Sequence, residues 1–380
     1  MSFLSLCLLL HLFQANCWGP QLAPALYVLG DSMVDSGNND ALSTTAKVNY
    51  KPYSIDFPYD TSTGRFTNGK TSADFIAQFL GLPFAPPYMG LSVNQKSKIT
   101  TGINYASGSA GILQETGSAL GKNLPLKVQI EMFNETVTQY LPKNFKTNDE
   151  FLHYLSKSIF LVNVGSNDFL NNYLLPTQYN SSHQYSPEQF ASLLLQELKQ
   201  YLQKLYNLGA RKFVVFNVGP LGCIPAIVKQ ENVKIGCAKR VNYFVSVYDK
   251  GFPSMIQELR DSLKDSTFVH GDINLLNSDL SIDTSLISEI SRLTQLTHLN
   301  LFLDGISKIE NFITASPCCS NLDNETNLCV KDSSPCMDRA IHVYWDGFHP
   351  TQVVYMMLSI GCFYAPLPCS PINVLQLAMK

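Results

Sequence analysis

Three short apolar runs along the chain predict buried β-strands. They span residues 25–29, 159–164 and 213–218, and each is followed directly by a glycine and then by polar or turn-forming residues. Long segments with helical patterning separate the runs. This order of elements is typical of parallel βαβ construction, so the pattern predicts an α/β fold.

The clearest helix of the pattern begins after Ser186. Ser186 can cap this helix, Pro187 fits its first position, a leucine-rich stripe follows, and Gly209 ends it. The helix connects the second and third predicted strands. In an open parallel sheet, binding groups gather at the carboxyl ends of the strands, which is where the pattern places Ser32 and Asn167.

One stretch, residues 277–316, departs from this pattern. Its leucines and isoleucines include the spacing of a single leucine-rich repeat. Because a solenoid needs roughly three or more repeats to bury its face, we expect an amphipathic helix packed on the α/β body, or a lid over the site. The sequence contains no other repeat and no low-complexity linker. Residues 18–380 are therefore predicted to form a single domain.

Composition and charge exclude several classes of protein. Of the 380 residues, 45% are hydrophobic and only 15% are charged, which favours a globular core over a disordered or coiled-coil chain. The net charge of -3 supplies no broad basic surface for nucleic acid or acidic membranes. We therefore expect no nucleic-acid partner.

The first 17 residues predict a signal peptide. Residues 4–13 form an apolar run too short to span a bilayer, and Ala15 and Cys17 offer a cleavage site, although no Lys or Arg precedes the run. No later stretch approaches about 18 uninterrupted apolar residues. The sequence thus predicts a secreted, extracellular protein with no transmembrane segment, and it carries no signal for oligomeric state.

The cysteines and the glycosylation motifs agree with secretion. Of the ten cysteines, Cys7 and Cys17 fall in the predicted leader, and the remaining eight form an even set suited to disulfides. A zinc site is the rival interpretation, but the sequence has no paired C-x-x-C spacing. N-glycosylation motifs begin at Asn134, Asn180 and Asn324.

The segment Gly30-Asp31-Ser32 places a hydroxyl directly after the first predicted strand. Gly30 permits a tight turn, and the free N–H groups of a following helix can meet an oxyanion. A serine at such a place is otherwise an ordinary helix cap. Other residues must decide whether Ser32 is a nucleophile.

The segment Asp346-Gly347-Phe348-His349 provides suitable partners for this serine. An Asp and a His three positions apart on one turn allow the carboxylate to hold one imidazole nitrogen while the other nitrogen faces a serine hydroxyl. The alternative is an acidic helix start beside a surface histidine. Together with Ser32, the segment predicts a Ser-His-Asp triad.

Two runs of small residues are candidates for an oxyanion hole. The backbone of residues 104–111 can approach a substrate closely, and Asn167 offers an amide donor. The first run also comes near the G-x-S-x-G motif around Ser109, which would make Ser109 a rival nucleophile. However, Ser107 stands where that motif needs its first glycine.

Several blocks, in this order, resemble those of the plant GDSL esterase/lipase family, part of the SGNH hydrolase superfamily. They are GDSMVDSGNN at 30–39, NYASGSAGIL at 104–113, GSND at 165–168, FNVGPLGCIP at 216–225, DGFHPT at 346–351 and SPINVLQLA at 370–378. The resemblance covers nearly all of the chain after the leader. It breaks at 277–316, where family members have a short helix and an aromatic-glycine loop.

The resemblance implies a flavodoxin-like SGNH hydrolase fold, a three-layer α/β/α sandwich with a mainly parallel central sheet. It also implies a catalytic triad of Ser32, Asp346 and His349. The oxyanion donors that it implies are Ser32, Gly108, with Gly111 as the alternative, and Asn167. The family chemistry uses no metal and no organic cofactor.

The function expected from the residues and the resemblance is hydrolysis of carboxylic esters through an acyl-enzyme. The substrates would be lipid, acetyl or other acyl esters, on a small molecule or a polysaccharide. The same groups can serve an acyltransferase or a polysaccharide deacetylase. A protein of another class, a catalytically silent secreted carrier of lipid or glycan whose 277–316 segment closes the pocket, is the alternative.

Overall fold

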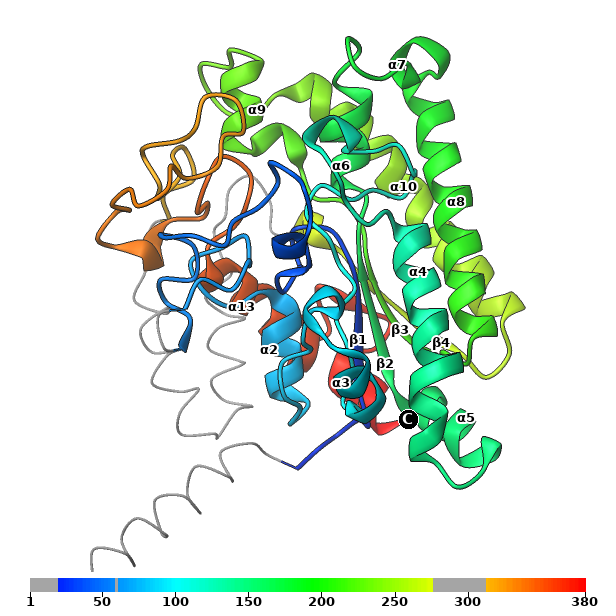
Figure 1. Ribbon diagram of the computed structural model, residues 1–380. Coiled ribbons are helices and arrows are strands. Elements are labelled where there is room, and N and C mark those ends of the chain that lie inside the picture. Colours follow the sequence, from blue (N-terminus) through cyan, green and yellow to red (C-terminus); the bar gives the residue numbers. More distant parts are fainter. Residues whose placement is uncertain (1–19, 59–60, 276–311) are drawn as a thin grey trace, which may run out of the picture.

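The chain folds as a sheet between two layers of helices (Figure 1). The computed structural model describes residues 20–58, 61–275 and 312–380, so the predicted leader and most of the 277–316 segment lie outside the described residues. The sheet has the order β1-β2-β3-β4-β5, in which the first four strands are parallel and β5 is antiparallel to β4. Its strands are β1 (Leu26–Gly30), β2 (Ile159–Asn163), β3 (Lys212–Phe216), β4 (Thr267–Gly271) and β5 (Cys369–Ser370).

A further extended segment, residues 101–105, runs along the free edge of β1. Leu26 N–H donates to Thr101 O over 3.1 Å, and Tyr105 N–H donates to Val28 O over 2.8 Å. The chain thus places one strand-like segment on one side of β1 and β2 on the other, which is the strand order of flavodoxin-like folds. The predicted α/β/α architecture is confirmed, and β1 is the point where the strand order reverses.

Each face of the sheet is covered by helices because β1 is apolar on both sides. Tyr27 and Leu29 belong to one core cluster, and Leu26 and Val28 belong to the other. The first face is covered by α4 (Leu126–Glu135), α8 (Pro187–Asn207) and α10 (Lys239–Ser262). The second is covered by α2 (Ser72–Phe79), α13 (Gln352–Tyr364) and α14 (Val374–Met379).

Short helices join these layers. They are α3 (Val93–Lys98), α5 (Asn148–Lys157), α6 (Ser166–Asp168), α7 (Ser181–Gln184) and α9 (Pro225–Gln230). Three further short helical segments matter for the site. They are the π-helix η7 (Phe169–Tyr173) and the 3₁₀-helices η8 (Leu221–Cys223) and η9 (Ile273–Leu275). They follow the carboxyl ends of β2, β3 and β4, so their side chains gather at one edge of the sheet.

The predicted helix after Ser186 is confirmed as α8. The Ser186 hydroxyl accepts from the N–H of Gln189, the Gln189 side chain accepts from the N–H of Ser186, and Pro187 occupies the first turn. Gly209, with φ of 108°, lies just beyond its end. The sequence signals at both ends of this helix are local and act as predicted.

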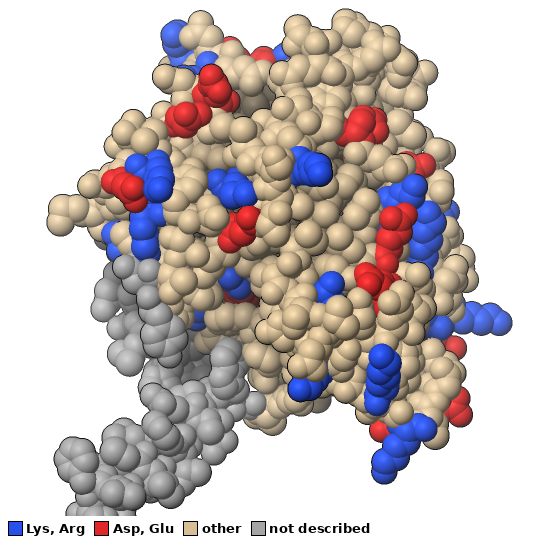
Figure 2. All heavy atoms as spheres, viewed as in Figure 1, with Lys and Arg blue, Asp and Glu red and all other residues tan. Residues whose placement is uncertain are grey.

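Charges on the described surface follow the balanced composition. On the face drawn in Figure 2, basic and acidic side chains are scattered, and neither sign forms a broad patch. No helix within the described ranges is both long and apolar enough to cross a membrane.

Candidate active site

Ser32 follows β1 at the carboxyl edge of the sheet, where Gly30 allows a close backbone approach. A Cβ atom at Gly30 would lie 2.2 Å from the carbonyl oxygen of Asn163 on β2, so no side chain fits there. The N–H of Asp31 donates to that same carbonyl over 3.0 Å. The chain therefore turns sharply out of the sheet and presents Ser32 at its edge.

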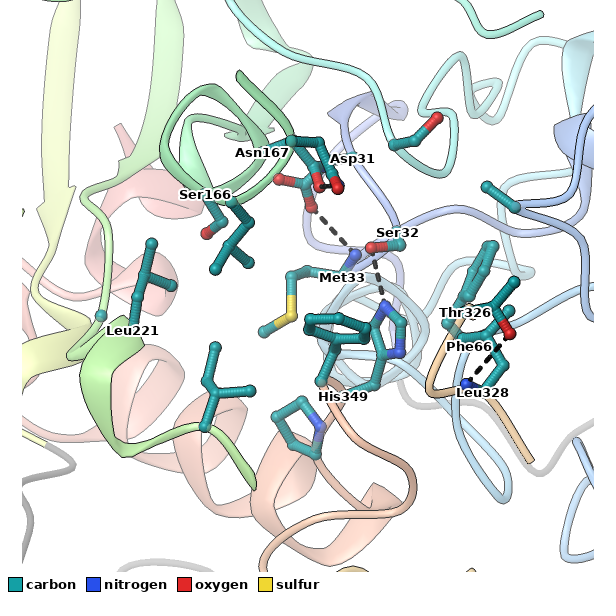
Figure 3. A pocket seen from close by; sticks show the side chains of 18 of the residues that line it. Asp31, Ser32, Met33, Phe66, Ser166, Asn167, Leu221, Thr326, Leu328 and His349 are labelled. Carbon is teal, nitrogen blue, oxygen red and sulfur yellow. Dashed lines mark hydrogen bonds between the residues drawn. The ribbon is translucent and has the colours of Figure 1, made fainter. Parts of the chain in front are cut away.

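The three residues of the predicted triad lie within hydrogen-bonding distance of one another. Ser32 Oγ is 2.9 Å from His349 Nε2 (Figure 3). His349 Nδ1 is 2.9 Å from both carboxylate oxygens of Asp346. Asp346 is fully buried and His349 nearly so. This geometry allows His349 to accept the proton of Ser32 while Asp346 holds the ring.

Asp346 is held by more groups than the sequence suggested. Its carboxylate accepts from the backbone N–H groups of Phe348 and His349, each over 2.8 Å, and from the hydroxyl of Tyr53 over 2.6 Å. The Tyr53 hydroxyl in turn accepts from the N–H of Cys329 over 3.0 Å. Nothing local in the sequence marks Tyr53, almost three hundred positions away along the chain, as a partner of Asp346.

Asn167 lies on α6, shortly after β2, and lines the same cavity as Ser32. Its Nδ2 atom donates to Ala110 O over 3.0 Å, and its Oδ1 atom accepts from Asn171 Nδ2 over 2.6 Å. These two bonds fix the orientation of the amide. An amide nitrogen carries two hydrogens, so one donor is left for a ligand.

Gly108 is not placed as an oxyanion donor, which corrects the expectation from the sequence. Its N–H donates to the buried carboxylate of Asp35 over 3.0 Å, its carbonyl accepts from Asn39 Nδ2 over 3.0 Å, and neither Gly108 nor the alternative Gly111 lines the cavity. Both polar groups of Gly108 are used to hold the loop. Ser109, the next residue after Gly108, takes its place in the cavity wall.

Ser109 lines the cavity with a strained backbone. Its φ of 63° is unusual for a residue with a side chain. Among the described residues, the N–H groups of Ser109 and Ser32 have no hydrogen-bond partner. The Ser109 hydroxyl lies 3.2 Å from Asn123 Nδ2, whereas the hydroxyl that His349 contacts is that of Ser32. The Ser109 N–H can therefore donate to a ligand, and its hydroxyl is not the one that His349 contacts.

A second buried carboxylate fixes the position of the loop that carries Ser109. Asp168 accepts from the N–H groups of Ile112 and Leu113 over 2.8 and 3.0 Å and from the Thr116 hydroxyl over 2.8 Å. Burial raises the pKa of Asp168 to about 6, although these three donors oppose the shift. Asn167 and Asp168 are neighbours on α6, so this one short helix positions both the amide of Asn167 and the loop that carries Ser109.

The cavity beside Ser32 is walled largely by apolar side chains. Leu170, Leu221, Ile224, Phe348 and Leu328 are among them. Two of its lining residues, Asp31 and Asn163, carry a buried side-chain atom, Oδ2 and Nδ2 respectively, that has no partner among the described residues. An apolar cavity with a few polar groups near a nucleophile is the usual form of a small-molecule site.

Burial makes the stability of the fold depend on the protonation of Asp31. Desolvation raises the pKa of this carboxyl to about 7, and the charge of Asp168 adds to the rise, whereas the Met33 N–H opposes it. The folded state therefore holds the proton more tightly than the unfolded chain. Stability that is present below an ordinary aspartate pKa of about 4 is lost as the pH rises through about 7.

We expect the thermal midpoint of unfolding to fall by at least about 2 °C between about pH 5 and about pH 8. Asp31→Asn stays neutral at every pH, so its thermal midpoint is expected to fall less. The fall that remains in this variant would come from Asp35 and Asp249, whose pKa values burial also raises to about 7. Differential scanning calorimetry of both proteins measures this. An equal fall in the variant would show that Asp31 does not titrate in the folded protein.

All eight cysteines outside residues 1–17 are paired in disulfides. The pairs are Cys223–Cys237, Cys318–Cys336, Cys319–Cys329 and Cys362–Cys369. The prediction that these eight cysteines form disulfides is thus confirmed. None of the eight keeps a free thiolate that could bind zinc. The three asparagines of the glycosylation motifs, Asn134, Asn180 and Asn324, are exposed, and their modification stays a prediction.

The fold and the family comparisons together define the chain as a carboxylic ester hydrolase of the α/β type. It belongs to the GDSL-like lipase/acylhydrolase family, which matches residues 26–359. The Arabidopsis thaliana protein GDSL esterase/lipase 7 is 38% identical over 362 residues, which cover 94% of this chain and 92% of that protein. GDSL esterase/lipase At1g33811, also from Arabidopsis thaliana, is 35% identical over 385 residues, 99% of this chain and 97% of its own length.

Proposed function

We propose that the chain hydrolyses carboxylic esters through an acyl-enzyme on Ser32. His349 Nε2 takes the hydroxyl proton as Ser32 Oγ bonds to the ester carbonyl carbon. His349 then gives that proton to the alcohol oxygen as the ester C–O bond breaks. Water attacks the acyl-enzyme in the same way, the acid leaves, and Ser32 recovers its proton. Asp346 stabilises the imidazolium that forms in both halves of the reaction.

The developing oxyanion is held by three donors in this proposal, namely the N–H groups of Ser32 and Ser109 and the amide of Asn167. Donors that are fixed before the reaction cost no reorganisation in the transition state. The hydrogen bonds of Gly108 to Asp35 and Asn39 support this assignment, because they fix the residue next to Ser109. In this mechanism the groups of the protein that act on the ester and on the attacking water are side chains and backbone of this chain.

One observation carries the proposal, namely the 2.9 Å contact between Ser32 Oγ and His349 Nε2 beside an apolar cavity. Its test is intact-mass analysis after reaction with a fluorophosphonate, followed by peptide mapping. We expect a single adduct on the peptide that contains Ser32, with loss of ester hydrolysis in step with labelling. A folded protein that forms no adduct would favour the catalytically silent carrier instead.

We also propose that the protein is secreted after cleavage of residues 1–17. Four disulfides fit an oxidising compartment, and the three asparagine motifs are exposed at the surface. N-terminal sequencing of the protein recovered from the medium of a eukaryotic secretion host tests this. A mature protein that begins near residue 18 is the expected result, and retention of residue 1 would contradict it.

A further inference from the structure

Another cavity lies at the amino ends of the strands, at the opposite end of the sheet from Ser32. It is lined by Arg211 and Lys212 at the start of β3 and by Thr267 at the start of β4. In Figure 1, α5 and the chain end marked C lie beside these strand ends. The volume of the cavity, about 200 Å³, is many times what one water molecule needs. The cavity therefore has room for a small ligand.

The lining of this cavity carries an excess of positive charge. Its cationic residues are Lys157, Arg211, Lys212 and Lys380, and its one acidic side chain is that of Asp265. Asp265 is exposed and forms no ion pair with any of these cations within the described ranges. Even if a chain-end carboxylate at Lys380 is counted, four cations face two carboxylates. The balancing negative charge has to come from an ion or a ligand.

Lys212 is the most buried of these cations. It is only 5% exposed, yet its ammonium donates to a single acceptor, Ala378 O, over 3.0 Å. An ammonium has three hydrogens, so two of them are without a partner among the described residues. Burial lowers the pKa of Lys212 to about 8, and the charges of Lys157 and Lys380 add to the fall. Lys212 therefore still carries its charge at pH 7, in a place where a charge without an opposite one is costly.

The guanidinium of Arg211 is held in a fixed orientation beside Lys212. Its Nη1 donates to Tyr206 O over 2.7 Å and to Ala210 O over 2.8 Å, and its Cζ lies 3.9 Å from the centroid of the Tyr206 ring. The hydrogens of its Nε and Nη2, like the hydroxyl of Thr267, have no partner in the described part of the chain. A fixed guanidinium edge next to an ammonium is the donor arrangement that suits phosphate oxygens.

We propose that this cavity binds a small free oxyanion of the phosphate type between Arg211, Lys212 and Thr267. The Nε and Nη2 edge of Arg211 donates to two oxygens of the ion, and the ammonium of Lys212 donates to another. Lys157 and Lys380 are more exposed and attract the ion from solvent. The site is separate from the Ser32 cavity, and the inference does not depend on the proposed function. A bound ion would stabilise the fold, because only the folded chain assembles these donors.

The test is isothermal titration of the full folded protein with inorganic phosphate at pH 7, with sodium chloride holding the ionic strength constant. One site per chain is expected, with a Kd of about 1 mM or lower. Lys212→Met keeps a long side chain and removes the charge, so it is expected to raise the Kd at least about ten-fold. Arg211→Met changes a half-buried residue and is expected to raise the Kd by a similar factor. This second variant keeps the test decisive if Lys212→Met does not fold.

Lys250→Met is the matched control, because it removes an exposed cation of α10 that does not line the cavity and changes the net charge equally. Its Kd is expected to stay within roughly two-fold of the wild-type value. The inference is overturned if the wild-type protein shows no saturable phosphate binding below about 10 mM. It is also overturned if a folded Arg211→Met protein binds phosphate as tightly as wild type, or if Lys250→Met weakens binding as much as Arg211→Met does. The last result would show attraction by net charge alone.

Discussion

Replacing Ser32 by alanine is expected to lower kcat for ester hydrolysis by about 10⁶-fold, the size of loss seen when a catalytic serine is removed from a triad. The variant lacks the oxygen that bonds to the acyl carbon, so the acyl-enzyme cannot form. Its remaining activity comes from the oxyanion donors and from binding alone. The rate with p-nitrophenyl octanoate, measured at saturating substrate, gives the loss directly.

The loss should be purely catalytic, because Ser32 contributes little to the fold. Calorimetry is expected to show a thermal midpoint close to that of the wild type. Ser109→Ala is the control, since its contribution in the proposed mechanism is a backbone N–H that alanine keeps. Its rate is expected to stay within about ten-fold of wild type. A Ser32→Ala protein with comparable activity would remove Ser32 as the nucleophile.

Replacing Asp346 by asparagine is expected to lower kcat by about 10⁴-fold, with a smaller effect on KM. In the structure, both oxygens of Asp346 lie 2.9 Å from His349 Nδ1. An asparagine amide has one oxygen and an NH₂ group in their place, and it no longer compensates the imidazolium charge. The histidine then adopts the tautomer that cannot accept the proton of Ser32. Stopped-flow and steady-state rates with the same ester test this.

Tyr53→Phe separates a supporting role from a catalytic one. The phenylalanine keeps the ring packed against Trp345 and removes only the hydroxyl that donates to Asp346. A hydrogen bond to a charged group contributes about 1.5–3 kcal/mol, so the loss in kcat is expected to be at most about 10²-fold. A loss as large as that of Asp346→Asn would show that the tyrosine hydroxyl itself takes part in the reaction.

Much of the fold followed from the sequence because its signals are local. The apolar runs before Gly30, Gly165 and Gly219 are the strands β1, β2 and β3, and the capping residues of α8 mark its start. Three parts were missed, namely β4, the two-residue β5 and the extended segment 101–105 at the edge of β1. Strand β4 contains a histidine and a threonine, and the segment at 101–105 is interrupted by Gly102, so neither has the continuous apolar run of a buried strand.

The sequence by itself determined the α/β class and brought Ser32, Asn167, Asp346 and His349 forward as one set of functional residues. It could do so because the strand pattern, the turns after the strands and the short spacing between Asp346 and His349 are properties of neighbouring residues. Only the tertiary structure decided which backbone N–H of a cavity-lining residue has no partner and which side chain holds Asp346. The sequence left Gly108 and Gly111 open as the oxyanion donor and did not suggest the backbone of Ser109, but the buried carboxylate of Asp35 occupies the N–H of Gly108, and among the described residues the N–H of Ser109 has no partner. Such choices depend on hydrogen bonds between segments far apart in the chain, which no local pattern records.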